Sequence, residues 1–291
     1  VLQGLTASTT DTLNLTVTGA AASVTHGAAI ADATIGTVDF SAGGLDDTTT
    51  NLSADTYAAL DKVVAKDGDV VITISDAADG TIVSTVLSTI GGKTTGDVTL
   101  TNAQTVTGSE AELTAALITA GSKVILGGSS PLTMSGSGAY DKVQALAGVT
   151  NAGNITGTVA ETTAANLSGN GFNNMDGNDE LAISVSGTPT KNELNTIKSR
   201  TSGVITATTD LTIADGKLLN TDNNDQITLT LSDTGGVVAT DLSAVGAKSG
   251  ATVTLTNGQE ISGSESELTA ALVTAASKVV LGGSSALTMS G

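Results

Sequence analysis

The sequence predicts an α/β solenoid, in which short parallel β-strands and short capped helices form rungs that stack on one another. The first observation is an internal copy. Residues 98–136 recur as residues 253–291, an offset of 155 residues, and 30 of the 39 paired positions are identical. The second observation is that helix-start signals alternate with β-branched runs along the chain. A near-copy at a fixed spacing is typical of a repeat array.

A shorter repeat of about 28 residues lies inside the long one. Its members are residues 109–136 and 264–291, and the more diverged residues 81–108 and 188–216. We therefore predict one continuous repeat array over residues 1–291.

The second long copy stops at Gly291, whereas the first runs on beyond Gly136 into a further helix-like segment. The chain also begins at Val1, without an initiator Met or an export signal. We expect it to be a fragment of a longer chain.

Each short repeat begins with a helix signal. Ser109 is placed to cap the first turn of a helix, and Glu112, three residues later, is placed to reach back to the backbone of the cap residue. The same pattern recurs at Ser264 with Glu267 and at Thr190 with Glu193. The apolar face after Ser109 consists of Leu113, Ala116, Leu117 and Ala120.

Runs rich in Val, Ile and Thr follow or separate these helices and predict strands. They are residues 70–75, 97–101, 122–126, 203–213, 225–231 and 277–281. The alternative fold is a series of tandem β-sandwich domains. The recurrent capped helices favour the solenoid.

Composition excludes several classes of function. The formal net charge of −18 and the pI near 4.1 disfavour binding to nucleic acid and to anionic membranes. No apolar run is long enough to span a bilayer, so we expect no membrane insertion. There is no Cys, which excludes disulfides and thiolate chemistry.

The sequence does not predict an enzyme. Aromatic residues make up only 1% of the chain, whereas sugar-cleaving clefts normally hold their substrate against aromatic rings. The single histidine, His26, has no Cys partner or convincing Ser triad and is expected in a surface turn. No nucleotide-binding loop, zinc motif or nucleophile elbow occurs in a supporting context.

Two loops rich in Asp and Asn are candidate calcium sites. Ca²⁺ takes six to eight oxygen ligands, which carboxylates, amides and backbone carbonyls supply. The candidate ligands are Asp176, Asn178 and Asp179 in the first loop, and Asp222, Asn224 and Asp225 in the second. The competing interpretation is that Asp, Asn and Gly simply form turns. Calcium is the one cofactor that the sequence brings forward.

The segment from Leu181 to Gly216 combines a Thr/Val strand, a capped helix at its NELNTI run and a returning TSGVITAT strand. In this pattern the chain resembles the repeat regions of giant bacterial cell-surface proteins, such as those of marine cyanobacteria, and related calcium-associated adhesins. The resemblance implies an exported protein with a structural or adhesive role.

We therefore expect a structural repeat protein of the cell exterior, part of a surface layer, sheath or extracellular filament, that assembles with like subunits. The alternative is a binding module, either an adhesin stalk or the shaft of a phage tail fibre. A polysaccharide-acting solenoid enzyme ranks third. The sequence also contains four Asn-x-Ser/Thr sequons, which leave open whether the protein carries a surface glycan. They begin at Asn14, Asn51, Asn154 and Asn166.

Overall fold

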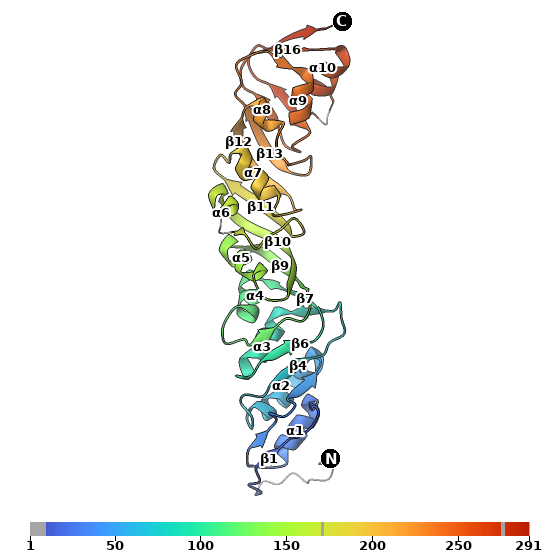
Figure 1. The fold of residues 1–291 in the computed structure, drawn as a ribbon, viewed down its shortest axis with the longest axis vertical. Coiled ribbons are helices and arrows are strands. Elements are labelled where there is room, and N and C mark those ends of the chain that lie inside the picture. Colours follow the sequence, from blue (N-terminus) through green and yellow to red (C-terminus); the bar gives the residue numbers. More distant parts are fainter. Residues whose placement is uncertain (1–9, 170–171, 275–276, 291) are drawn as a thin grey trace. The chain divides into compact units, whose positions relative to one another are not determined.

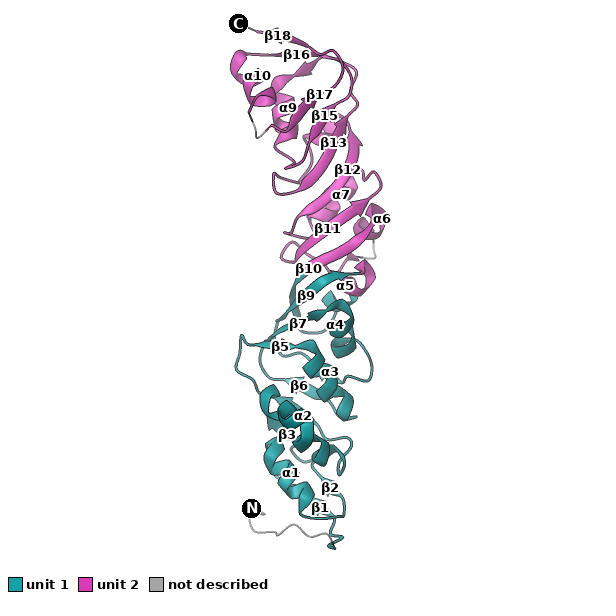
Figure 2. Ribbon diagram, turned by 180° about the vertical axis from the view of Figure 1, so that it is seen from behind, with its two compact units in different colours: residues 1–138, 145–156 teal, residues 139–144, 157–291 magenta. Residues whose placement is uncertain are grey.

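The computed structural model describes residues 10–169, 172–274 and 277–290. It is an α/β fold in which the strand pairings described are parallel. The chain divides into two compact units (Figure 2). Unit 1 consists of residues 1–138 and 145–156, and unit 2 of residues 139–144 and 157–291. Helix α5 (Tyr140–Ala147) and strand β10 (Ala152–Thr163) have residues in both.

In unit 1, short strands alternate with short helices along the chain (Figure 1). The elements are β1 (Leu15–Thr16), α1 (Val24–Asp32), β2 (Val38–Asp39), β3 (Leu45–Asp47), α2 (Thr49–Val64), β4 (Ile72–Ile74), β5 (Thr81–Val83), α3 (Ser84–Lys93), β6 (Val98–Leu100), β7 (Thr105–Ser109), α4 (Glu110–Leu117), β8 (Val124–Ile125) and β9 (Ser130–Gly138).

Parallel ladders connect the successive repeats of unit 1. One runs in the order β3-β4-β6-β8, and β5, β7 and β9 pair in another. In the first ladder, Leu45 pairs with Ile72, Ile72 with Val98, and Val98 with Val124. The first three of these side chains are fully buried. Aliphatic residues at equivalent positions therefore stack into a column and form the core with few aromatic rings.

Unit 2 follows the same alternation. Its elements are α6 (Ala164–Ser168), β11 (Glu180–Ser186), α7 (Lys191–Lys198), β12 (Ile205–Leu211), α8 (Ile213–Gly216), β13 (Gln226–Leu231), β14 (Val237–Val238), α9 (Ala239–Gly246), β15 (Val253–Leu255), β16 (Glu260–Gly263), α10 (Glu265–Leu272), β17 (Val279–Leu281) and β18 (Ala286–Met289).

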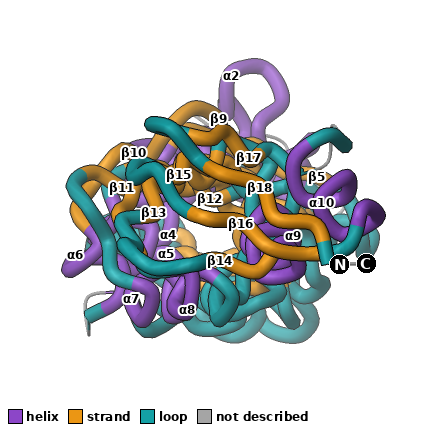
Figure 3. Tube along the Cα trace, turned by 90° about the horizontal axis from the view of Figure 1, so that it is seen from above, coloured by secondary structure: helices purple, strands orange, loops and turns teal. Residues whose placement is uncertain are grey.

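Unit 2 also contains two ladders. Strands β11, β12, β13, β15 and β17 pair in that order, and β14, β16 and β18 form a separate three-stranded sheet (Figure 3). Leu211, Leu231, Leu255 and Leu281 pair in sequence, which places four leucines in one column. These partners are 20, 24 and 26 residues apart in the chain.

Every predicted strand run contains a strand of the structure, although the strands are shorter than the runs. For example, the run at residues 97–101 forms β6, and the run at residues 203–213 forms β12. The capping boxes at Ser109, Thr190 and Ser264 are also confirmed. The hydroxyl of each cap residue accepts a bond from the backbone amide of the glutamate three residues later, and the backbone amide of each cap residue donates to that glutamate's carboxylate.

Two local predictions were wrong. Helix α4 ends at Leu117, so Ala120 lies beyond the helix and is exposed instead of lining its buried face. The amides of Ile118 and Thr119 both bond to the Thr114 carbonyl, which closes the helix there. His26 lies in the first turn of α1 rather than in a surface turn, although it is exposed as expected.

Glycine allows adjacent repeats to approach closely. A Cβ atom on Gly91, near the end of α3, would lie 1.6 Å from the carbonyl oxygen of Ser122. The equivalent Gly246 in unit 2 would place its Cβ atom 2.1 Å from the carbonyl of Ser277. Any side chain at these two positions would force the neighbouring backbone away.

Candidate functional site

In most repeats, a buried polar side chain occupies the turn before one strand. We call these side chains the corner residues. In unit 1 they are Thr34, Asp67, Thr94 and Ser122; in unit 2 they are Asp179, Thr201, Asp225, Ser249 and Ser277. Buried polar groups are costly unless they are hydrogen-bonded, so their partners show what these positions do.

Thr201 connects its own repeat to the preceding one. Its hydroxyl oxygen accepts bonds from the amides of Leu181 and Gly203, both at 2.9 Å, and lies 2.8 Å from the Leu181 carbonyl, to which it donates. Residue 181 is in the preceding repeat, whereas Gly203 is in the same turn as Thr201. One hydroxyl therefore satisfies backbone groups on two successive repeats.

Other hydroxyls of the set make the same connection. The hydroxyl of Ser249 accepts from the Ile227 amide at 3.0 Å and donates to the Ile227 carbonyl at 2.7 Å. In unit 1, Thr94 donates to the Val70 carbonyl at 2.7 Å. Thr34 has the corresponding place at the start of the unit, and its hydroxyl lies within hydrogen-bonding distance of the carbonyls of residues 11 and 13.

At three corners, Asp67, Asp179 and Asp225, a carboxylate replaces the hydroxyl, and the bonds of Asp67 and Asp225 reach the preceding repeat. Asp67 accepts from the Phe40 amide at 2.7 Å, and Asp225 accepts from the Ile205 amide at 2.9 Å. Burial raises the pKa of Asp67, although the bond from Phe40 opposes that shift. Asp225 has no exposed side-chain surface and pairs with the ammonium of Lys198 at 3.0 Å. Its charge is therefore compensated within the fold.

A second group of carboxylates caps helices of the preceding repeat. Asp47 accepts from the Val24 amide at the start of α1, and Asp76 accepts from the Thr49 amide at the start of α2. Asp233 accepts from the Ile213 amide at the start of α8. These bonds span 23, 27 and 20 residues. These three aspartates are thus located where helix amides need acceptors.

Ion pairs connect successive helices on the outer surface. In unit 1, Lys62 of α2 pairs with Asp32 of α1, and Lys93 of α3 pairs with Asp61 of α2. In unit 2 the pairs are Lys191 with Asp215 at 2.8 Å and Lys217 with Asp241 at 2.6 Å. The bond from Lys191 lowers the pKa of Asp215. Exposed pairs of this kind contribute only about 0.2–1 kcal/mol each, so they mainly select which helix lies next to which.

The predicted calcium loops form hydrogen-bonded turns. In the first loop, the Asp176 amide donates to Asp179 at 2.9 Å, and the Asn178 amide donates to Asp176 at 2.7 Å. The second loop repeats this arrangement, with the Asp222 amide donating to Asp225 and the Asn224 amide donating to Asp222.

Asp179 and Asp225 are buried, whereas the other four predicted ligands are exposed. Within the described part of the chain, no three His, Asp or Glu side chains are grouped to hold a metal ion. Calcium binding at these loops stays a prediction.

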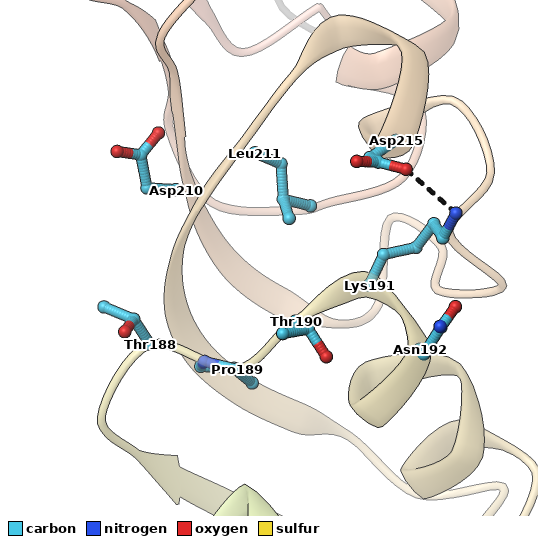
Figure 4. A pocket seen from close by; sticks show the side chains of 8 residues that line it. All are labelled: Thr188, Pro189, Thr190, Lys191, Asn192, Asp210, Leu211 and Asp215. Atoms are coloured by element: carbon cyan, nitrogen blue, oxygen red, sulfur yellow. Dashed lines mark hydrogen bonds and ion pairs between the residues drawn. The ribbon is translucent and has the colours of Figure 1, made fainter.

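An open pocket of about 440 Å³ lies in unit 2 between the start of α7 and the end of β12 (Figure 4). The ion pair between Lys191 and Asp215 crosses one side of it, and Thr188, Thr190 and Asp210 contribute further polar groups. The Lys191 ammonium is already paired with a carboxylate. The Thr190 hydroxyl donates to the Glu193 carboxylate at 2.8 Å, and this bond belongs to the capping box of α7.

Sequence reasoning named two corner residues, Asp179 and Asp225, only as calcium ligands and missed the others, although a signal for some of them was present. Several precede a β-branched run as Thr-x-Gly: Thr34, Thr94 and Thr201 each have glycine two residues later. Comparison of the chain with protein-family models, with curated proteins and with solved structures found no match. No helix in the described residues is long and apolar enough to cross a membrane.

Proposed function

We propose that this chain is a structural repeat protein of the cell exterior, built as an α/β solenoid. It would form part of a surface layer, sheath or extracellular filament through stacked rungs and end-to-end assembly. In each unit, a rung is one strand–helix repeat. The observation that carries the proposal is that corner side chains recurrently bond the rung before their own; they are Thr34, Asp67, Thr94, Thr201, Asp225 and Ser249.

Several features support a role that depends on stacking. Buried hydroxyls, carboxylate caps and ion pairs all join residues about one repeat apart. The column of leucines uses side chains that tolerate repetition along a ladder. The acidic surface disfavours anionic partners and keeps such a stack soluble.

Two experiments test this function. Immunogold labelling of intact cells of the source organism should decorate the outer surface, and electron microscopy should show the native protein in continuous filaments or lattices. Isolated trimeric fibres would instead favour the shaft of a tail fibre. Label restricted to the interior of sectioned cells would refute an exterior location.

A further inference from the structure

The internal copy allows the same sequence to be compared at two places in the fold. Strand β9 of unit 1 and strand β18 of unit 2 occupy equivalent positions, 155 residues apart. In unit 1, Leu132 and Met134 are 0% and 5% exposed. Their counterparts, Leu287 and Met289, are 55% and 70% exposed. The difference lies in the surroundings, because these side chains are identical.

Residues 145–156 of unit 1 lie against the first copy and show what covers it. Asn151 donates its side-chain amide to the Leu126 carbonyl at 2.7 Å, and its own carbonyl accepts from the Ser130 amide at 2.8 Å. Gly153 approaches so closely that a Cβ atom there would lie 3.0 Å from the Ser129 carbonyl. Ile155 is fully buried.

These contacts describe the chemistry of the covering strand. The first requirement is an Asn at the bonding position: Asn151 adopts a left-handed backbone with φ of 64° and bonds the Leu126 carbonyl through its side chain. The second is a glycine two residues later, where a Cβ atom would crowd the neighbouring backbone, and the third is an apolar residue two further on. The sequence Asn-Ala-Gly-Asn-Ile of residues 151–155 meets all three requirements.

The second copy offers the same receiving groups. The Leu281 carbonyl and the Ser285 amide correspond to those of Leu126 and Ser130. In unit 2, β17 and β18 are the last strands of their ladders in the described residues. We define the terminal edge as Leu281, Ser285, Leu287 and Met289. It combines apolar side chains with strand groups of the kind that an added strand bonds.

We propose that the terminal edge is a docking site for one further rung whose strand carries the Asn-x-Gly-x-Ile chemistry of residues 151–155. The inference rests on the stacking role proposed above and specifies both the surface and its occupant. The occupant would bond the Leu281 carbonyl and the Ser285 amide, as Asn151 bonds the Leu126 carbonyl and the Ser130 amide, and it would bury Leu287 and Met289.

The test appends a second copy of residues 137–163 after Gly291 and measures hydrogen exchange. We expect exchange at the amides of Ser285 and of β18 to slow at least tenfold relative to the unextended chain. The matched control carries Asn151→Ala and Gly153→Val in the appended copy only, and exchange in β18 should then remain fast. Because these changes leave residues 1–291 intact, both proteins should fold alike.

Three results would overturn the proposal. One is unchanged exchange in the extended protein, and another is equal protection in the matched control. The third is an oligomer of the unextended chain, seen by sedimentation and abolished by Met289→Lys, because a second copy would then be the occupant. These results do not depend on where the protein resides. A failure of the docking proposal can therefore be distinguished from a failure of the proposed exterior location.

Discussion

Replacing Thr201 with valine removes one hydroxyl and preserves the shape of the side chain. Thr201 is 1% exposed, so water cannot take the place of the lost oxygen without rearrangement. The change leaves the amides of Leu181 and Gly203 and the Leu181 carbonyl without this partner. The perturbation therefore isolates the bonds between two repeats from the packing between them.

The magnitude follows from those contacts. Leaving a buried donor unsatisfied costs about 1–3 kcal/mol, and Thr201→Val affects two amides, one of them only partly buried. We expect a loss of about 2–5 kcal/mol in the free energy of unfolding of unit 2. The control is Thr201→Ser, which retains the hydroxyl and removes one methyl group, at a cost of about 1 kcal/mol. Serine already occupies the equivalent corner at Ser249.

Urea unfolding followed by circular dichroism measures the midpoint of each variant, and hydrogen exchange at β11 and β12 locates the loss. The valine variant should unfold at lower urea than the serine variant and should exchange faster at both strands. Equal midpoints for valine and serine would refute the reasoning, because the hydroxyl would then contribute no more than the methyl group that serine lacks.

Three further predictions concern packing, pH and calcium. Gly91→Ala should destabilise unit 1 by about 1–3 kcal/mol or more in urea unfolding, because its Cβ atom would meet the Ser122 carbonyl. The control is Gly92→Ala, whose Cβ atom meets nothing within 4 Å; this variant should be neutral or stabilising. Bonds from the backbone amide and hydroxyl of its N-cap serine lower the pKa of Glu267 below the ordinary 4.5. The stability that these bonds give the ionised Glu267 is complete above its unfolded pKa and is lost as the pH falls through its folded pKa. Glu267→Gln should therefore flatten the decline of the thermal midpoint below pH 4.5. If the two Asp/Asn loops bind calcium, the thermal midpoint should rise with added Ca²⁺ and fall with chelator; identical midpoints would exclude a stabilising site.

Local features of the fold were predictable because they depend on neighbouring residues. The capping boxes at Ser109, Thr190 and Ser264 follow from side chains three residues apart, and the strands follow from alternating Val, Ile and Thr. The C-terminal end of α4 was less predictable, because the apolar spacing continues to Ala120 although the backbone closes the helix at Leu117.

Contacts between repeats were not predictable in the same way. The register that pairs Leu229 with Val253 joins residues 24 apart, and nothing in either strand alone specifies it. The role of Asp225 shows the same limit. Its loop has the composition of a calcium site, whereas the structure shows its carboxylate bonded to the Ile205 amide and to Lys198. Sequence identified the residue and its oxygen chemistry, but not its partners.

The most direct test of the stacking account is to remove the second copy, residues 253–291, together with the residue before it, from the end of the chain. In a stack, each repeat interacts only with its neighbours, so a chain of residues 1–251 should keep β11, β12 and β13 folded and protected from hydrogen exchange. Its unfolding midpoint should be lower than that of the full chain, by an increment comparable to that of one rung interface. Loss of protection throughout β11 and β12 in the shortened chain would contradict the account, because unit 2 would then fold only as a whole.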